Sequence, residues 1–361
     1  MIKSKDHKTS RIQYLDSIRG IAAMIVVVFH FMAWRWGDTL QFNIAAFVFN
    51  GTEAVSFFFV LSGFVLSYSY VNSSRKIEFG RYLYKRILRL YPAYVLNILL
   101  LFIYDLRDYS FESIFIRYER VLPIKEWLMF QDTHDLYVPG WTLQIEIIYS
   151  VIIIGLILLY RKHPYWLLLP LIGSYVIGSP DIRLYMNHFI MGICLSIIYP
   201  KLKDVSFAAT RFYPWRWAIY ALIFVLFSFV NIARFFKPID DMFHLFWTYN
   251  IRWAHFSGFA AFLFLIIVMM SKNIQALLEN KVLLYLGKIS YSIYLIHWII
   301  GLFIMNNWQV WGQYLGEGAF RVFVMFILFI GASVFAADLM YRFIEAPFIR
   351  ISKLRNVTSQ K

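Results

Sequence analysis

Two ionisable residues lie in the first long apolar stretch of the chain, at about residues 18–36. Arg19 stands near its start and His30 in its interior, eleven positions apart. Eleven helical steps of about 100° bring two side chains to within about 20° of one another, roughly 16 Å apart along the axis. Ionisable groups are costly in a membrane helix and usually face a protein interior or a wet cavity. The spacing therefore indicates a guanidinium near one membrane surface and an imidazole deeper on the same helix face.

Each of these two residues also has a purely structural interpretation. Arg19 fits the excess of cations that flanks membrane helices on the cytoplasmic side. His30 would then be a packed histidine, hydrogen-bonded to a neighbouring helix. The sequence of this helix alone leaves both interpretations open.

Two further titratable residues, Glu146 and His297, stand within later apolar stretches. From the helical rise, we place His30 at ~18 Å, His297 at ~21 Å and Glu146 at ~22 Å from the cytoplasmic edge of a ~30 Å core. A carboxylate beside an imidazole fixes its tautomer and makes it a general base. We therefore expect His30 to be the base and Glu146 its support, with His297 as the competing partner. A buried polar network that only locks helices together remains the alternative.

The densest group of cations falls between the second and third apolar stretches and comprises Arg75, Lys76, Arg81, Lys85, Arg86 and Arg89. Cations at 85, 86 and 89 can share one helix face. Binding of anionic lipid headgroups would explain them. So would docking of a phosphorylated cytoplasmic ligand, since guanidinium groups match phosphate with two parallel hydrogen bonds.

Composition indicates a polytopic membrane protein. The chain has 361 residues, of which 60% are hydrophobic and only 16% charged, against about 25% charged in soluble domains. We expect an all-α fold that is one integral-membrane domain over residues 1–361, with polar tails at about 1–13 and 350–361. About ten transmembrane helices are predicted, at 18–36, 47–70, 91–106, 141–160, 165–179, 187–200, 217–235, 251–271, 283–305 and 320–343.

The net charge of +14 is first a signal of topology. With these boundaries, most Lys and Arg fall on the side that both termini share, which places the termini in the cytoplasm. Nucleic acid is therefore not an expected partner, whereas a lipid bilayer is. One cysteine excludes an intramolecular disulfide, and no metal-binding spacing is found. The oligomeric state is not indicated.

Six segments, in this order, carry a resemblance to a known family: YLDSIRGIAAMIVVVFHF with its Arg-x10-His pair, EAVSFFFVLSGFVLSYSY, Arg86-x-x-Arg89 followed by LYPAY, WTLQIEIIY, LGKISYSIYLIHW and RFIEAPF. The chain resembles membrane acyltransferase family 3, the O-acyltransferases that modify bacterial surface polysaccharides. Where the family often has Gly-Val-Asp, this chain has Ala54, Val55 and Ser56. It resembles the stand-alone form without a C-terminal esterase-like domain.

The resemblance implies an O-acetyltransferase of the bacterial cytoplasmic membrane. It would move an acyl group, typically acetyl from acetyl-CoA, to a hydroxyl of a surface or lipid-linked polysaccharide such as lipopolysaccharide on the outer side. Arg19, Arg86 and Arg89 would hold the acyl-CoA, and His30 with Glu146 would be catalytic. Trp141, Tyr291 and His297 would contact substrate or support the site, and no metal is expected.

A proton-coupled transporter or exporter is the principal alternative, because it too carries His and Glu groups near the membrane midplane. A non-catalytic membrane scaffold is a third class. The aromatic outer loop from about 105 to 140 is compatible with sugar binding, although an interfacial aromatic belt explains many of the same residues.

Overall fold

A computed structural model describes residues 12–37, 44–73, 76–108, 137–173, 180–236 and 254–358. Regular structure within these ranges is entirely helical, as the sequence predicts. Most of the predicted outer loop, residues 109–136, lies outside the described residues, as does Arg75.

Six helical segments in the described ranges are long and apolar enough to cross a membrane. They are Gln13–Trp36 (α1), Ala45–Val71 (α2, Ala45–Val48, with α3, Gly51–Val71), Phe79–Asp105 (in α4, Phe79–Asp108), Gly140–Lys162 (α7), Lys281–Asn306 (α15) and Ala319–Ser352. The last comprises α17 (Ala319–Met340), a π-helical turn η5 (Tyr341–Glu345) and the start of α18 (Ala346–Thr358). The multi-pass membrane character is thus evident in the helices themselves.

The other four predicted spans are not among these six. The described part of 165–179, which ends at 173, contains η2 (Pro164–Leu167) and α8 (Leu168–Gly173). Residues 217–235 divide at Ser228 into α10 (Arg216–Phe227) and α11 (Phe229–Phe235). Residues 187–200 lie in the longer α9 (Pro180–Leu202). Helix α13 (Ala254–Met270) bends by 101° into α14 (Lys272–Leu278), and the two make a seventh span if they cross together. The count of ten stays a prediction.

Helix α4 begins twelve residues before the predicted start at 91, at Phe79. The predicted start lay too far along the chain because it was set by the first apolar residues, whereas the first three turns of α4 carry cations. Those cations line a cavity between the helices. Pro92 is tolerated inside this 30-residue helix.

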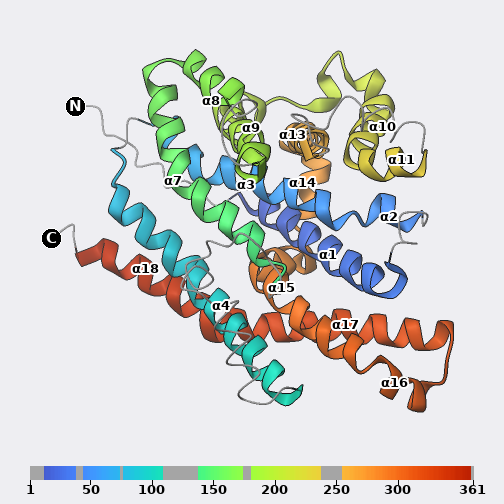
Figure 1. Ribbon diagram of the computed structural model, residues 1–361. Helices are drawn as coiled ribbons and strands as arrows, with labels where there is room; N and C mark the ends of the chain where they lie inside the picture. The colour runs from blue at the N-terminus through green and yellow to red at the C-terminus, as the bar shows by residue number, and fades with distance from the viewer. Residues whose placement is uncertain are drawn as a thin grey trace.

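Helices α1 and α15 run parallel through the centre of the molecule (Figure 1). A Cβ atom at Gly20 would lie 2.5 Å from the backbone nitrogen of Gly287, so only glycine permits this approach. The largest apolar core surrounds the pair and takes buried side chains from α3, α4, α7, α9 and α17. Figure 1 places α18 at one end of the bundle and the short helix α16 (Trp308–Leu315) at the other.

Candidate active site

A cavity of about 590 Å³ opens between α1, α3, α4, α15 and α18. Seven cations line it: Arg19, Lys76, Arg81, Lys85, Arg86, Arg89 and Lys288. Its carboxylates are those of Asp16, Glu78 and Glu345. The cavity is therefore positively charged, as a site for a phosphorylated ligand must be.

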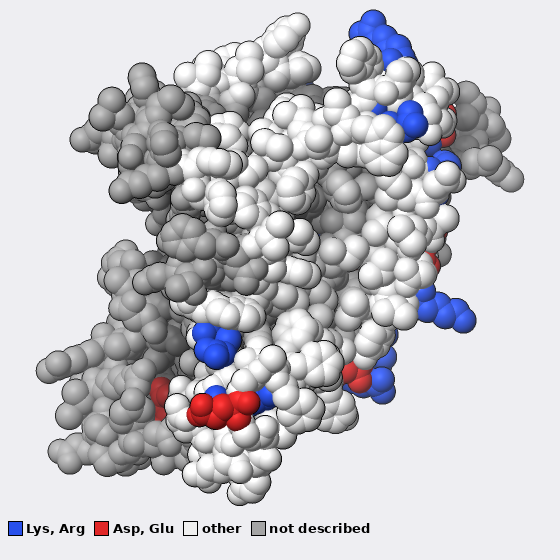
Figure 2. Space-filling view, turned by 90° about the vertical axis from the view of Figure 1, so that its right-hand side faces the viewer, with Lys and Arg blue, Asp and Glu red and all other residues white. Residues whose placement is uncertain are grey.

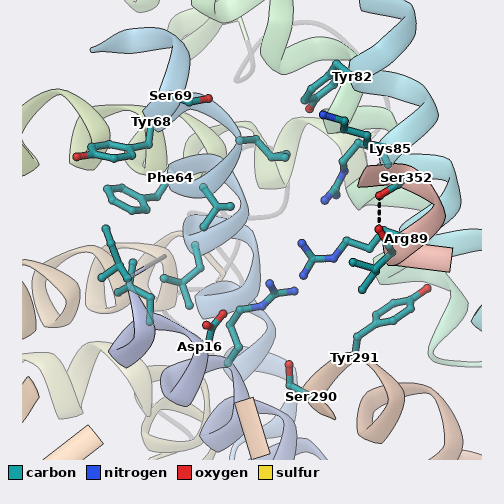
Figure 3. A pocket seen from close by; sticks show the side chains of 18 of the residues that line it. Asp16, Phe64, Tyr68, Ser69, Tyr82, Lys85, Arg89, Ser290, Tyr291 and Ser352 are labelled. Atoms are coloured by element: carbon teal, nitrogen blue, oxygen red, sulfur yellow. Dashed lines mark hydrogen bonds between the residues drawn. The ribbon is translucent and has the colours of Figure 1, made fainter. Parts of the chain in front are cut away.

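Two of these cations have donor groups that the described residues leave unused. The Nε atoms of Arg19 and Arg89 are buried and have no hydrogen-bond partner there. Figure 3 shows the Arg89 side chain extending from α4 into the space in front of α1, where Asp16 lies. A buried guanidinium without its full set of acceptors is costly, and a phosphate oxygen would supply the missing acceptors.

Arg86 instead has a fixed set of partners within the protein. Its Nη2 donates to Oε1 of Glu146 at 2.6 Å, and its Nε donates to Oγ of Ser150 at 2.9 Å. Arg86 is only 8% exposed, so the ion pair is largely shielded from solvent. The pair joins α4 to α7 and fixes how far Arg86 reaches into the cavity.

A second, narrow cavity of about 30 Å³ lies beside the first. Arg19 and Tyr291 lie on the walls of both cavities. Thr142, Glu146 and Tyr294 line the narrow one. The two cavities therefore adjoin at Arg19 and Tyr291, and the narrow one lies between α1, α3, α7 and α15.

A pair of histidines lies next to Tyr294, on the far side from the basic cavity's shared wall. The Tyr294 ring lies 6.0 Å from the His297 ring, centroid to centroid. His297 is fully buried, and its Nε2 lies 3.2 Å from Nδ1 of the half-buried His30. The sequence-based depths of these two histidines thus correspond to a direct contact.

The backbone fixes where the two rings carry their hydrogens. His30 Nδ1 lies 3.0 Å from the Val26 carbonyl oxygen, and His297 Nδ1 lies 3.1 Å from that of Ile293. A carbonyl oxygen can only accept, so in the neutral rings each Nδ1 carries the hydrogen. The one hydrogen on His30 Nδ1 is then shared between the Val26 carbonyl oxygen and His297 Nε2, which both accept it. His30 Nε2 keeps its lone pair, takes no hydrogen bond from the described residues, and is the nitrogen available as a base.

Two residues were predicted to support His30. His297 contacts it, whereas Glu146 forms an ion pair with Arg86. Glu146 is not among the contacts of His30 in the described ranges. Trp141 packs its ring against Tyr185, 5.6 Å away between centroids. Tyr291 is buried and donates its hydroxyl hydrogen to the Leu90 carbonyl oxygen at 2.7 Å, which positions it between the cavities.

Glu345 was missed as a site residue by sequence reasoning, although it stands in the RFIEAPF segment. It is 4% exposed, lines the basic cavity and accepts a hydrogen bond from Ser292 Oγ at 2.9 Å. It ends a π-helical turn, a feature that often marks functional sites. The rule applied to Glu146, that an ionisable residue within a membrane helix suggests function, would have identified it.

No group of three or more His, Cys, Asp or Glu side chains within the described ranges could hold a metal ion. The arrangement can instead bind an anion at one end and accept a proton from a substrate at the other. A narrow cavity lined partly by polar side chains lies between the two ends.

The chain belongs to the acyltransferase family 3, whose domain model, described as an acyltransferase domain, matches residues 12–342. A Staphylococcus aureus (strain COL) protein that is provisionally named an O-acetyltransferase is 25% identical over 382 residues, covering 96% of this chain and 58% of that protein. The O-acetyltransferase OatA of Staphylococcus aureus (strain NCTC 8325 / PS 47) is 24% identical over 374 residues, covering 92% of this chain and 56% of OatA.

The chain thus spans a little more than half the length of the curated relatives that it matches. No solved structure matches it.

Proposed function

We propose that this chain is a membrane O-acetyltransferase that takes an acetyl group from cytoplasmic acetyl-CoA and delivers it to a hydroxyl of a surface or lipid-linked polysaccharide. The observation that carries the proposal is the adjacency of the basic cavity, the narrow cavity and the histidine pair. The basic cavity shares Arg19 and Tyr291 with the narrow cavity, and Tyr294 on the narrow cavity contacts the histidine pair. The names of the relatives support acetyl as the acyl group.

The donor would bind with its phosphates in the basic cavity. Arg19 and Arg89 offer unused Nε–H groups, and Arg86 is held at a fixed reach by Glu146. The extended pantetheine arm would follow the narrow cavity and bring the thioester toward His30. The helical rise between Arg19 and His30, about 16 Å, sets the length that this arm must cover.

His30 would act as the general base. The acceptor hydroxyl oxygen attacks the thioester carbonyl carbon while its proton passes to His30 Nε2. The carbon–sulfur bond then breaks, and the CoA thiolate leaves and takes up a proton. His297 Nε2 accepts from His30 Nδ1–H, so it orients the ring and stabilises the imidazolium once it forms.

This assignment implies a topology. The basic cavity faces the cytoplasm and the histidine pair lies toward the outer side of a bacterial inner membrane, with ten spans and both termini cytoplasmic. The excess of Lys and Arg near the cavity agrees with this orientation.

The test is acetyl transfer in membranes of cells that express the chain. With radiolabelled acetyl-CoA, we expect alkali-labile acetyl groups in the polysaccharide fraction. The His30→Ala variant should lose about 10²–10⁴-fold in rate, the usual contribution of a general base. Wild-type membranes that transport a glycan without acetylating it would support the transporter alternative and refute the proposal.

A further inference from the structure

An arginine–tryptophan cluster lies at the end of the bundle away from the basic cavity, where α1 ends and α16 and α17 begin. It comprises Arg35, Trp308, Trp311 and Arg321. The Cζ atoms of Arg35 and Arg321 lie 5.5 Å and 5.1 Å from the centre of the Trp308 ring. Two cations thus share one aromatic ring, although like charges repel. Figure 2 views this end and shows a mostly uncharged surface with a few blue and red side chains close together.

Arg321 is the buried member of this cluster. It is 7% exposed, and its Nε and Nη1 have no hydrogen-bond partner among the described residues. Glu317 is the neighbouring carboxylate, but its side chain is 85% exposed and its Oε1 lies 3.9 Å from Arg321 Nη2, beyond hydrogen-bond range. The indole Nε1 of Trp311 is also buried without a partner. A set of buried donors without acceptors is costly unless a ligand supplies the acceptors.

The backbone here also favours an anion. Arg321 stands in the first turn of α17, and that turn contains no acidic residue. Gly318 caps the helix without a side-chain hydrogen bond. The amino-terminal end of a helix has unsatisfied N–H groups and a partial positive charge, so a cation there is unfavourable and an anion is favourable. Gly312 provides the room, since a methyl group at that position would collide with Arg321 Nη1.

The cluster is connected to the catalytic histidine through tryptophans. His30 lies 5.8 Å from Trp34 and 5.3 Å from Trp298, ring centroid to ring centroid, and the two tryptophans are 5.0 Å apart. Arg35 follows Trp34 directly, five residues beyond His30, or about 7.5 Å along the helix axis. Aromatic faces suit sugar rings, and a short oligosaccharide spans this distance.

We propose that this cluster binds an oxyanion, carboxylate or phosphate, of the acceptor, so that the acceptor is an acidic glycan. This inference rests on the proposed function, because it takes His30 as the place where the acceptor hydroxyl reacts. Arg321 donates to the oxyanion from the buried side and Arg35 from the exposed side, and the Trp308 ring between them holds the two guanidinium groups in place. The cluster binds and orients the acceptor and does not take part in bond making.

The experiment measures binding without turnover. The full-length protein is placed in phosphatidylcholine nanodiscs, with CoA present at saturating concentration to occupy the basic cavity. Trigalacturonate and poly(glycerol phosphate) are the acidic probes, and maltotriose is the neutral one. We expect at least one acidic probe to bind about tenfold or more tightly than maltotriose, as a hydrogen-bonded charge pair predicts.

Matched variants locate the effect. Arg321→Gln should lose about tenfold in affinity for the acidic probe, whereas Arg211→Gln should not, because Arg211 is exposed beside Phe212 on a distant segment. Gly312→Ala keeps every charge but displaces the guanidinium, and it should weaken binding as Arg321→Gln does. Gly331→Ala is its control, since a Cβ there meets open space.

Three results would overturn the inference. The first is no preference for either acidic probe, and the second is equal probe binding by Arg321→Gln and wild type. The third is equal probe binding by the two proteins together with an enrichment of phosphatidylglycerol in mixed nanodiscs that depends on Arg321. The last would identify a lipid headgroup as the anion. Acetyl transfer without acidic preference defeats this inference and leaves the proposed function standing. Acidic-probe binding at Arg321 without acetyl transfer defeats the proposed function and the acceptor role, and leaves an anion-binding site at Arg321.

Discussion

The buried ion pair between Arg86 and Glu146 permits a prediction that separates its structural role from its role in donor binding. Three variants are compared with wild type: Glu146→Leu, Arg86→Met, and the double variant. Each single variant leaves one charge buried without its partner. The double variant replaces both charges with apolar side chains of similar size.

The magnitudes follow from the burial of the pair. The side chains of Arg86 and Glu146 are 9% and 15% exposed, and their 2.6 Å contact is accompanied by the Ser150 hydrogen bond. Removing one partner of such a pair costs about 3–5 kcal/mol of unfolding free energy, whereas replacing both is often neutral. Ser150 stays satisfied in the double variant, because its hydroxyl donates to the Glu146 backbone carbonyl oxygen at 2.7 Å.

The assay has two readouts. The free energy of unfolding is measured by SDS titration in mixed micelles, and CoA affinity by calorimetry on the full-length protein. We expect both single variants to be destabilised and the double variant to unfold near the wild-type midpoint. The double variant should still bind CoA about tenfold to a hundredfold more weakly, since a charge-assisted hydrogen bond is lost.

Either of two results would refute this reasoning. Single variants that lose less than about 1 kcal/mol would show that the pair is not a shielded ion pair. A double variant of normal stability and normal CoA affinity would show that Arg86 has no part in binding the donor.

Three further outcomes are expected. Replacing His297 by Asn, which can also accept a hydrogen bond, should retain more turnover than replacing it by Phe, with the acceptor KM unchanged; equal loss in both would show that His297 only fills space. Replacing Arg89 by Lys should raise the KM for acetyl-CoA while kcat falls little, because an ammonium lacks the planar fork of guanidinium; an unchanged KM would remove Arg89 from the donor site. Replacing Gly20 by Ala should separate α1 from α15 and abolish transfer, since the new methyl meets the backbone of Gly287 at 2.5 Å; wild-type activity in that variant would contradict the tight approach.

The contact between the histidines was accessible from the sequence for a specific reason. Depth along a helix follows from the rise per residue, and α1 and α15 run in the same direction side by side. His30 and His297, which have similar depths on these two helices, therefore lie in contact. The same argument placed Glu146 at that depth, yet its carboxylate pairs with Arg86. Depth does not determine which helices are neighbours, and the hydropathy pattern concealed the first turns of α4, where Arg86 lies.

The arginine–tryptophan cluster was not predicted for a different reason. A single cation near the end of an apolar helix, such as Arg321, is interpreted under the rule for membrane topology as one of the cations that flank membrane helices. Only side-chain packing shows that Arg321 is buried against Gly312 and Trp308. The family resemblance, in contrast, was readable because its six segments occur in order along the chain.

The contact between His30 and His297 joins residues that lie 267 positions apart in the chain. A ribosome working at about 5–20 residues per second needs roughly 15–50 s to pass from one to the other. During that interval the first helix, already inserted, presents an imidazole for which the chain has not yet made the partner. The histidine pair is therefore completed only near the end of synthesis, and a truncated product lacking α15 would contain His30 without His297.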